Sequence, residues 1–156
     1  MSQTGSTTSS TKTPERRTGS QNVIDKLVAE RAEMLMLFCR VAGLEPFEHQ
    51  HHRKPARKLL QEFCQVLVDY IAAGHFSLYE RIVNGTERRS AIKDLAGRLY
   101  SGISDTTQSA LDFNDKYDNG EDDEIADSFH DDLSKLGEAL ALRVELEDQI
   151  INVMRR

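Results

Sequence analysis

The chain has 156 residues and a formal net charge of −6 at pH 7, from 26 acidic residues and 20 lysines and arginines. This length suits one domain, and the acidic balance disfavours direct binding of nucleic acid and favours a basic protein partner. No apolar run is long enough to span a membrane and no signal-peptide core is present, so we expect a cytoplasmic protein. Cys39 and Cys64 show no zinc or CxxC spacing, and we expect both to be buried thiols.

The first segment, residues 1–20, is rich in Ser and Thr and has no apolar period, which predicts a disordered tail before a helical domain at residues 21–156. We expect the first helix to begin near Asn22, a residue that can cap it, and to end at Gly43. A cation, Arg31, interrupts the apolar stripe, either to snorkel to water or to meet a buried acid. The stripe consists of Ile24, Leu27, Arg31, Met34, Phe38 and Val41.

A polar loop follows, with histidines at positions 49, 51 and 52. These histidines suggest a metal, but no Cys or Asp accompanies them at a fixed spacing, so we expect a solvated loop. The second helix should span residues 56–73 and end at Gly74 in the left-handed conformation. Ser77 and Glu80 then form a Ser-x-x-Glu capping box that predicts a short extra helix at residues 78–83. The stripe of the second helix consists of Leu59, Leu60, Phe63, Leu67, Tyr70 and Ile71.

The third long helix should begin within residues 86–90 and close at Asn119 and Gly120. Its apolar positions alternate at spacings of four and three, which is the period of a helical-bundle seam. They are Ile92, Ala96, Leu99, Ile103, Thr106, Ala110, Phe113 and Tyr117. The chain around its end is strongly acidic but lacks the residues of a calcium loop, so either a solvated face or an acidic docking surface is expected there.

The last helix should span residues 124–154, with Glu147 in the middle of its inner face. A buried carboxylate needs partners, and Arg31 and His75 are candidates on other segments. We therefore predict a partly buried polar network of Arg31, Asp69, His75 and Glu147, in which at least two members approach within hydrogen-bonding distance. Ser77 and Tyr79 could join it. The inner face consists of Ile125, Phe129, Leu133, Leu136, Leu140, Val144, Glu147, Ile151 and Met154.

Four long amphipathic helices with short connections and no strand pattern predict an all-α protein, an antiparallel four-helix bundle with a short extra helix after the second long helix. The stretch VDYIAAGHFSLYERI resembles the signature of the Rsd/AlgQ family of bacterial anti-sigma factors. The segments VIDKLVAER, LDFNDKYDNG and ALRVELEDQII resemble the same family, occur in its order and extend the likeness over residues 22–154.

The resemblance implies an all-helical, non-enzymatic anti-sigma factor. Such a protein binds the primary sigma factor RpoD, chiefly its region 4, and keeps it from RNA polymerase, thereby regulating transcription without a cofactor. We expect a monomer, and partner binding around the matching motif, with Phe76 and Tyr79 as apolar anchors. The motif residues are Asp69, Tyr70, His75, Phe76, Ser77, Tyr79 and Glu80.

Two alternatives come from the residues themselves. Helical bundles also hold metals, and Asp69, His75, Glu80, Glu147 and Asp148 are suitable ligand types, but no Glu-x-x-His places both side chains on one helix face. Acids and a histidine can also perform acid–base catalysis, but the chain has neither a phosphate-binding glycine loop nor a nucleophile with an adjacent base. A binding protein is therefore the favoured class.

Overall fold

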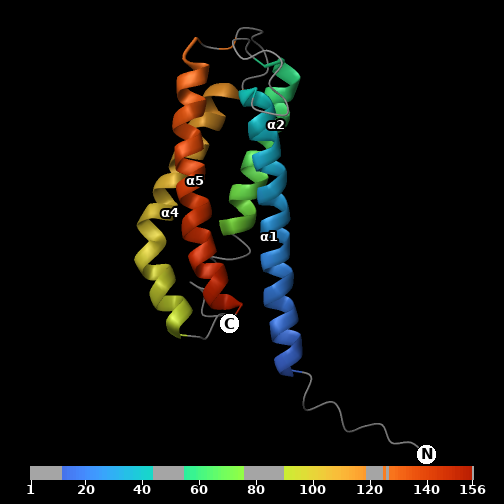
Figure 1. Ribbon diagram of the computed structural model, residues 1–156, viewed down its shortest axis with the longest axis vertical. Helices are drawn as coiled ribbons and strands as arrows, with labels where there is room; N and C mark the ends of the chain where they lie inside the picture. Colours follow the sequence, from blue (N-terminus) through green and yellow to red (C-terminus); the bar gives the residue numbers. More distant parts are fainter. Residues whose placement is uncertain (1–11, 44–54, 76–89, 119–124, 126, 156) are drawn as a thin grey trace, which may run out of the picture.

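The computed structural model describes residues 12–43, 55–75, 90–118, 125 and 127–155 (Figure 1). This part of the chain forms four helices and no strand, so the expected all-α class is confirmed for it. Helix α1 packs against α2 and α5, and α4 packs against the same two helices. The four helices are α1 (Lys12–Ala42), α2 (Arg57–Ala73), α4 (Ser90–Tyr117) and α5 (Phe129–Met154).

The helices form because their apolar residues recur on one face, and these faces meet in a single core. Most of the predicted stripe positions are buried, including Ile24 and Met34 of α1, Leu67 of α2 and Ile103 of α4. A few, such as Phe38, are only partly buried and pack against the core from its edge. The 3.5-residue period therefore identified the inner faces well.

Aromatic rings connect all four helices at one level of the core. Phe63 of α2 packs edge-on against Phe38 of α1, at 6.0 Å between centroids, and against Phe113 of α4 at 5.9 Å. The ring of Tyr117 contacts Phe113 at 4.6 Å and Phe129 of α5 at 5.3 Å. Such edge-on and tilted pairs add to the stabilisation that burial of the rings provides.

Two glycines of the described chain allow close approach of helices. A β-carbon at Gly137 of α5 would lie 2.8 Å from Cζ of Phe38, and one at Gly102 of α4 would lie 2.9 Å from Cδ1 of Leu146. Both separations are shorter than real β-carbons tolerate. The missing side chains therefore let α1 and α4 lie against α5.

The helix ends differ in part from the sequence predictions. Helix α1 begins at Lys12, before Asn22, because a capping residue marks a possible start and does not prevent helix before it. Gly43 follows α1 with φ of 70°, as expected of a left-handed helix end. Gly74 does not adopt that conformation: its φ of −61° and ψ of −47° are right-handed, and the backbone continues into a π turn with His75. The prediction for Gly74 was wrong because glycine permits a left-handed conformation without requiring it.

Several predictions concern residues outside the described part of the chain. These are residues 1–11 of the predicted tail, the histidine loop, the capping box and the extra helix at residues 78–83, and the acidic residues 121–124. Residues 12–20 of the predicted disordered tail are helical, as part of α1, so that prediction was wrong for them. Within the described helices, none is long and apolar enough to cross a membrane.

The two cysteines are free thiols. Cys39 is partly buried on α1, whereas Cys64 is fully buried on α2. Burial raises the pKa of Cys64 to about 12, the charge of Asp118 adds to this shift, and Arg57 opposes it. A thiol with this pKa stays protonated at neutral pH and is a poor nucleophile.

Candidate functional site

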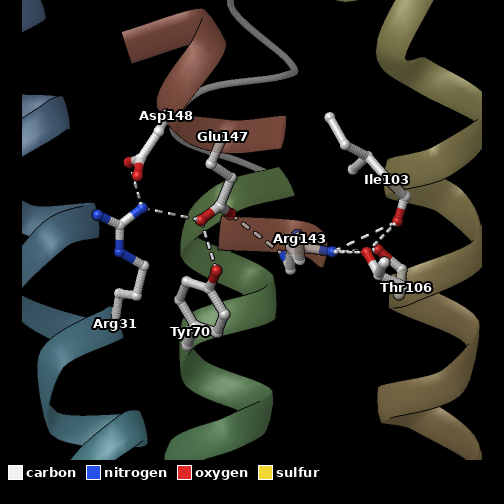
Figure 2. Close-up of polar contacts among 8 residues, drawn as sticks. Arg31, Tyr70, Ile103, Thr106, Arg143, Glu147 and Asp148 are labelled. Carbon is white, nitrogen blue, oxygen red and sulfur yellow. Dashed lines mark hydrogen bonds and ion pairs between the residues drawn. The ribbon is translucent and has the colours of Figure 1, made fainter. Parts of the chain in front are cut away.

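Side chains of α1, α2 and α5 converge on the carboxylate of Glu147, which is fully buried on α5 (Figure 2). Tyr70 of α2 donates its hydroxyl to Oε1 of Glu147 at 2.5 Å. Arg143, one turn earlier on α5, donates from Nε to Oε2 at 3.2 Å. Arg31 of α1 places Nη1 3.6 Å from Oε1. The carboxylate therefore interacts with two cations and one hydroxyl in a place that water does not reach.

Arg143 extends the network to α4 (Figure 2). Its Nη1 donates to Oγ1 of Thr107 at 2.7 Å and to Oγ1 of Thr106 at 3.2 Å. Its guanidinium carbon also lies 5.5 Å from the centre of the Tyr70 ring, a cation–π arrangement. A buried arginine whose donors are satisfied on both sides fixes the orientation of the carboxylate that it holds.

Arg31 joins the buried carboxylate to the surface. Its Nη1 donates to Oδ1 of Asp148 at 2.9 Å, and the Asp148 side chain is 48% exposed, against 14% for Arg31. Burial lowers the pKa of Arg31, but the hydrogen bond and charge of Asp148 and the charge of Glu147 outweigh it, so the pKa is raised overall. Arg31 therefore fulfils both expectations from the sequence. It meets a buried acid, Glu147, and its side chain reaches the edge of the core.

Burial dominates the electrostatics of Glu147. Loss of water raises the pKa of its carboxyl above the ordinary value, and the opposing effects of Arg143, Tyr70 and Arg31 offset only part of this rise. The two arginines and the tyrosine hydroxyl nevertheless reduce the cost of placing a charge in the core.

A groove of about 370 Å³ lies between α1 and α2, on the outer side of this network. Its walls carry the acids Glu30 and Glu33 from α1 and Asp69 from α2, against one base, Lys26. Small apolar residues complete the lining, namely Val66, Ala72 and Ala73. One carboxylate oxygen of Glu30 is buried and has no hydrogen-bond partner among the described residues.

The structure separates the predicted polar network into two groups. Arg31 and Glu147 come together, as an ion pair at 3.6 Å. Asp69 and His75 are exposed instead, and Asp69 accepts a hydrogen bond from Nε2 of Gln65 at 3.1 Å. Asp69 points outward because it precedes Tyr70, and consecutive helical residues diverge by about 100°.

The other motif residues are placed as follows. Tyr70 is fully buried and makes its contact inside the protein, with Glu147. Phe76, Ser77, Tyr79 and Glu80 lie outside the described residues.

Sequence reasoning missed Arg143, although the pattern contained it. The buried positions of α5 alternate at spacings of three and four, and this alternation passes through Arg143 and Ile150. The predicted inner face passed instead through the neighbouring Val144, which is only partly buried. A seam that carries an arginine four residues before a glutamate is itself the signal of a buried ion pair. The seam consists of Leu133, Leu136, Leu140, Arg143, Glu147, Ile150 and Met154.

A second polar cluster lies where α4 ends and α5 begins. Asp132 accepts hydrogen bonds from the hydroxyl of Tyr117 at 2.5 Å, from Nζ of Lys116 at 2.7 Å and from Oγ of Ser128 at 3.1 Å. The Asp132 side chain is 26% exposed. Lys116 is the largest cause that lowers the pKa of Asp132, followed by Tyr117.

The metal alternative can be tested only in the described chain. Within those residues, no three His, Cys, Asp or Glu side chains gather closely enough to hold a metal ion. Asp69, His75 and Glu147 therefore do not form a ligand set, and Glu80 lies outside the described residues.

In the part of the chain that the structure describes, the geometry defines an all-helical protein with a buried ion-pair centre and an acidic surface groove. The chain matches the family described as "Regulator of RNA polymerase sigma(70) subunit, Rsd/AlgQ" over residues 7–155, so it belongs to the Rsd/AlgQ family. The match begins within residues 1–20, which we had placed outside the resemblance.

Curated relatives agree with this assignment. "Regulator of sigma D" of Yersinia enterocolitica is 39% identical over 139 residues, which cover 88% of this chain and 83% of that protein. Proteins of the same name from Yersinia pseudotuberculosis and Salmonella arizonae are 38% and 35% identical, again over 88% of this chain, and the matches cover 82% and 84% of those proteins.

Proposed function

We propose that this chain is a non-enzymatic anti-sigma factor that binds the primary sigma factor RpoD, chiefly through region 4, and keeps it from RNA polymerase. Membership of the Rsd/AlgQ family carries the proposal, because the family description and the names of the relatives both refer to regulation of a sigma factor. The mechanism is occlusion in the bacterial cytoplasm: a sigma surface that holds this protein cannot also hold DNA or polymerase.

Charge supports this choice of partner. Region 4 contains a helix-turn-helix, and a DNA-reading helix-turn-helix is basic where it meets phosphates. The chain has a formal net charge of −6, and its α1–α2 groove carries more acids than bases. Opposite charges speed and orient the encounter of two proteins, while apolar contacts hold the complex.

The α1–α2 groove is the docking site that we propose within the described residues. Asp69 belongs to the family-like motif and lines the groove opposite Glu30 and Glu33. Glu33 and Asp69 are exposed residues of this lining, so an arginine or lysine of the partner can donate to their carboxylates. Phe76 and Tyr79, which lie outside the described residues, remain our proposed apolar anchors.

An antiparallel four-helix bundle is the scaffold that we propose for this groove. Contacts between α1 and α5 support it, because Asp25 pairs with Arg155 at 3.7 Å whereas Phe38 lies against Gly137. Residue numbers thus rise along one helix as they fall along the other. Arg57 at the start of α2 likewise donates to the carbonyl of Tyr117 at the end of α4, at 3.1 Å.

Isothermal titration of the full chain with purified sigma region 4 tests the function. We expect a one-to-one complex whose affinity falls as salt is raised, because the attraction between charged surfaces is screened. Absence of binding at low salt would overturn the proposal.

Charge-removing variants test the docking site. We expect Asp69→Asn and Glu33→Gln to weaken binding and to reduce its salt dependence, because each removes a carboxylate from the groove wall. Glu138→Gln is the matched control, since Glu138 is exposed on α5 and is not part of the groove. Equal effects of the groove and control variants would place the docking site elsewhere.

A further inference from the structure

The walls of the α1–α2 groove are built from residues whose chain neighbours point into the core. Glu30 lines the groove on α1, and the next residue, Arg31, reaches Glu147. Asp69 lines the groove on α2, and the next residue, Tyr70, also reaches Glu147. Glu30 and Asp69 are therefore each one peptide unit away from a group that the buried carboxylate holds.

The two oxygens of Glu147 divide their partners between the two sides of the protein. Oε2 accepts from Arg143, which is anchored to α4 through Thr107. Oε1 accepts from Tyr70 and faces Arg31, the inward residues of the two groove helices. Figure 2 shows Arg31 and Tyr70 approaching Glu147 from α1 and α2, and Arg143 approaching it from the side of α4.

Apolar packing holds α1 against α2, but no hydrogen bond or ion pair joins the described residues that line the two walls of the groove. Ala72, Ala73 and Val66 are small, and the acids on the two walls repel one another. Oε1 of Glu147, which Tyr70 and Arg31 share, is a polar tie between α2 and α1, and the anchored Arg143 holds the carboxylate in place through its other oxygen, Oε2. A fully satisfied buried polar network holds its members in one geometry.

We infer that Glu147 is a positioning residue for the α1–α2 groove: by holding Arg31 and Tyr70 on one oxygen, it sets the separation of Glu30 and Asp69. This inference rests on the proposed function, in which the groove receives basic side chains of sigma region 4. The partner cannot touch Glu147, which is fully buried. The affinity of the groove for the partner nevertheless depends on this carboxylate.

Tyr70→Phe tests the inference, because it removes the hydroxyl that bonds to Glu147 and keeps the ring. Tyr117→Phe is a matched control: it removes a hydroxyl that bonds to a carboxylate at the same distance of 2.5 Å, but at the second cluster. We expect Tyr70→Phe to weaken binding of sigma region 4 by about tenfold and Tyr117→Phe by less than about twofold. Arg31→Lys is a second variant, since it retains the charge and loses the planar fork.

A distance measurement on the free protein separates positioning from general loss of stability. Spin labels at Ala29→Cys on α1 and Glu62→Cys on α2, two exposed positions outside the groove lining, report the separation of the helices. Cys39→Ser removes the partly buried native thiol, and Cys64 is fully buried with a raised pKa. We expect Tyr70→Phe to broaden or shift the distance distribution and Tyr117→Phe to leave it unchanged.

The outcomes distinguish the inference from the function on which it rests. Unchanged affinity and distance in Tyr70→Phe, or equal changes in Tyr117→Phe, would overturn the positioning role even when the wild type binds sigma region 4. Failure of the wild type to bind would overturn the proposed function, and the label distances would then decide the positioning role on their own.

Discussion

The two polar clusters of this protein use the same chemistry and reach opposite electrostatic results. In the middle of the core, Glu147 accepts a tyrosine hydroxyl at 2.5 Å and faces two arginines, yet its pKa is raised. Where α4 meets α5, Asp132 accepts a hydrogen bond from a tyrosine hydroxyl at the same distance and another from a lysine. The pKa of Asp132 is lowered. The carboxyl that faces two cations is the one whose charge is disfavoured.

Access to water explains the difference. The Glu147 side chain is 0% exposed, whereas that of Asp132 is 26% exposed. Removing a carboxylate from water costs several kcal/mol, on the order of what good partners return. At the partly exposed Asp132, hydrogen-bond partners determine the direction of the pKa shift. At the buried Glu147, loss of water determines it.

The largest expected effect comes from breaking the buried pair. Arg143→Met removes a cation from a carboxylate that water cannot reach, and we expect the free energy of unfolding to fall by about 3–5 kcal/mol. Chemical denaturation measures it. The double variant Arg143→Met with Glu147→Leu should recover much of the loss, because no uncompensated charge remains. A single variant as stable as the wild type would contradict the role of Arg143.

The two tyrosines give the next comparison. We expect Tyr70→Phe to cost about 1.5–3 kcal/mol of unfolding free energy, because no water can replace its hydroxyl at Glu147. We expect Tyr117→Phe to cost about 0.5–1.5 kcal/mol, because Asp132 is partly exposed and can bind water instead. Denaturation of both variants in the same buffer measures the difference, and equal losses would show that burial does not distinguish the clusters.

The pH dependence of stability should run in opposite directions. The folded-state pKa of Glu147 lies above its ordinary value of 4.5, so its contribution to stability is full below pH 4.5 and falls as the pH rises through the raised pKa. The folded-state pKa of Asp132 lies below its ordinary value of 3.8, so its contribution is present above pH 3.8 and is lost as the pH falls through the lowered pKa.

Denaturation across acidic pH measures both slopes. With rising pH, the stability of the wild type relative to Glu147→Gln should decline, whereas its stability relative to Asp132→Asn should grow. If both relative stabilities changed with pH in the same direction, the pKa values of Glu147 and Asp132 would not be shifted in opposite directions, and the comparison would fail.

The smallest effect is expected at the exposed cation of the second cluster. Lys116→Met should leave the unfolding free energy nearly unchanged, because water replaces an exposed ammonium group. It should nevertheless raise the pKa of Asp132 toward 3.8, since the Lys116 hydrogen bond is the largest cause of its depression. Carboxyl NMR titration measures that pKa, and an unchanged value would assign the depression to Tyr117.

Periodicity predicted the fold class and most of the core, because burial of apolar faces determines both. It predicted a carboxylate inside the protein at Glu147 and a cation facing it at Arg31, because each breaks an apolar stripe. It placed Asp69 in the network incorrectly, since one helical position decides whether a side chain points into the core or into the groove.

Arg143 was missed for a related reason. Its charge argued for the surface, and only the presence of Glu147 one turn later and of Thr107 on another helix makes its burial favourable. A single segment does not contain that information, because the threonine belongs to α4 and its approach depends on how the helices pack. The same holds for the bond between Tyr70 and Glu147, whose two residues are 77 positions apart.

The contact of Phe38 with Gly137 has a consequence for how this sequence can change over generations. A β-carbon at position 137 would lie 2.8 Å from Cζ of Phe38, so a larger residue there requires the Phe38 ring to move or a smaller side chain to take its place. The two positions are thus coupled in one direction over evolutionary time: position 38 can become smaller while Gly137 is retained, whereas a larger residue at position 137 requires the ring of Phe38 to shift or to be lost.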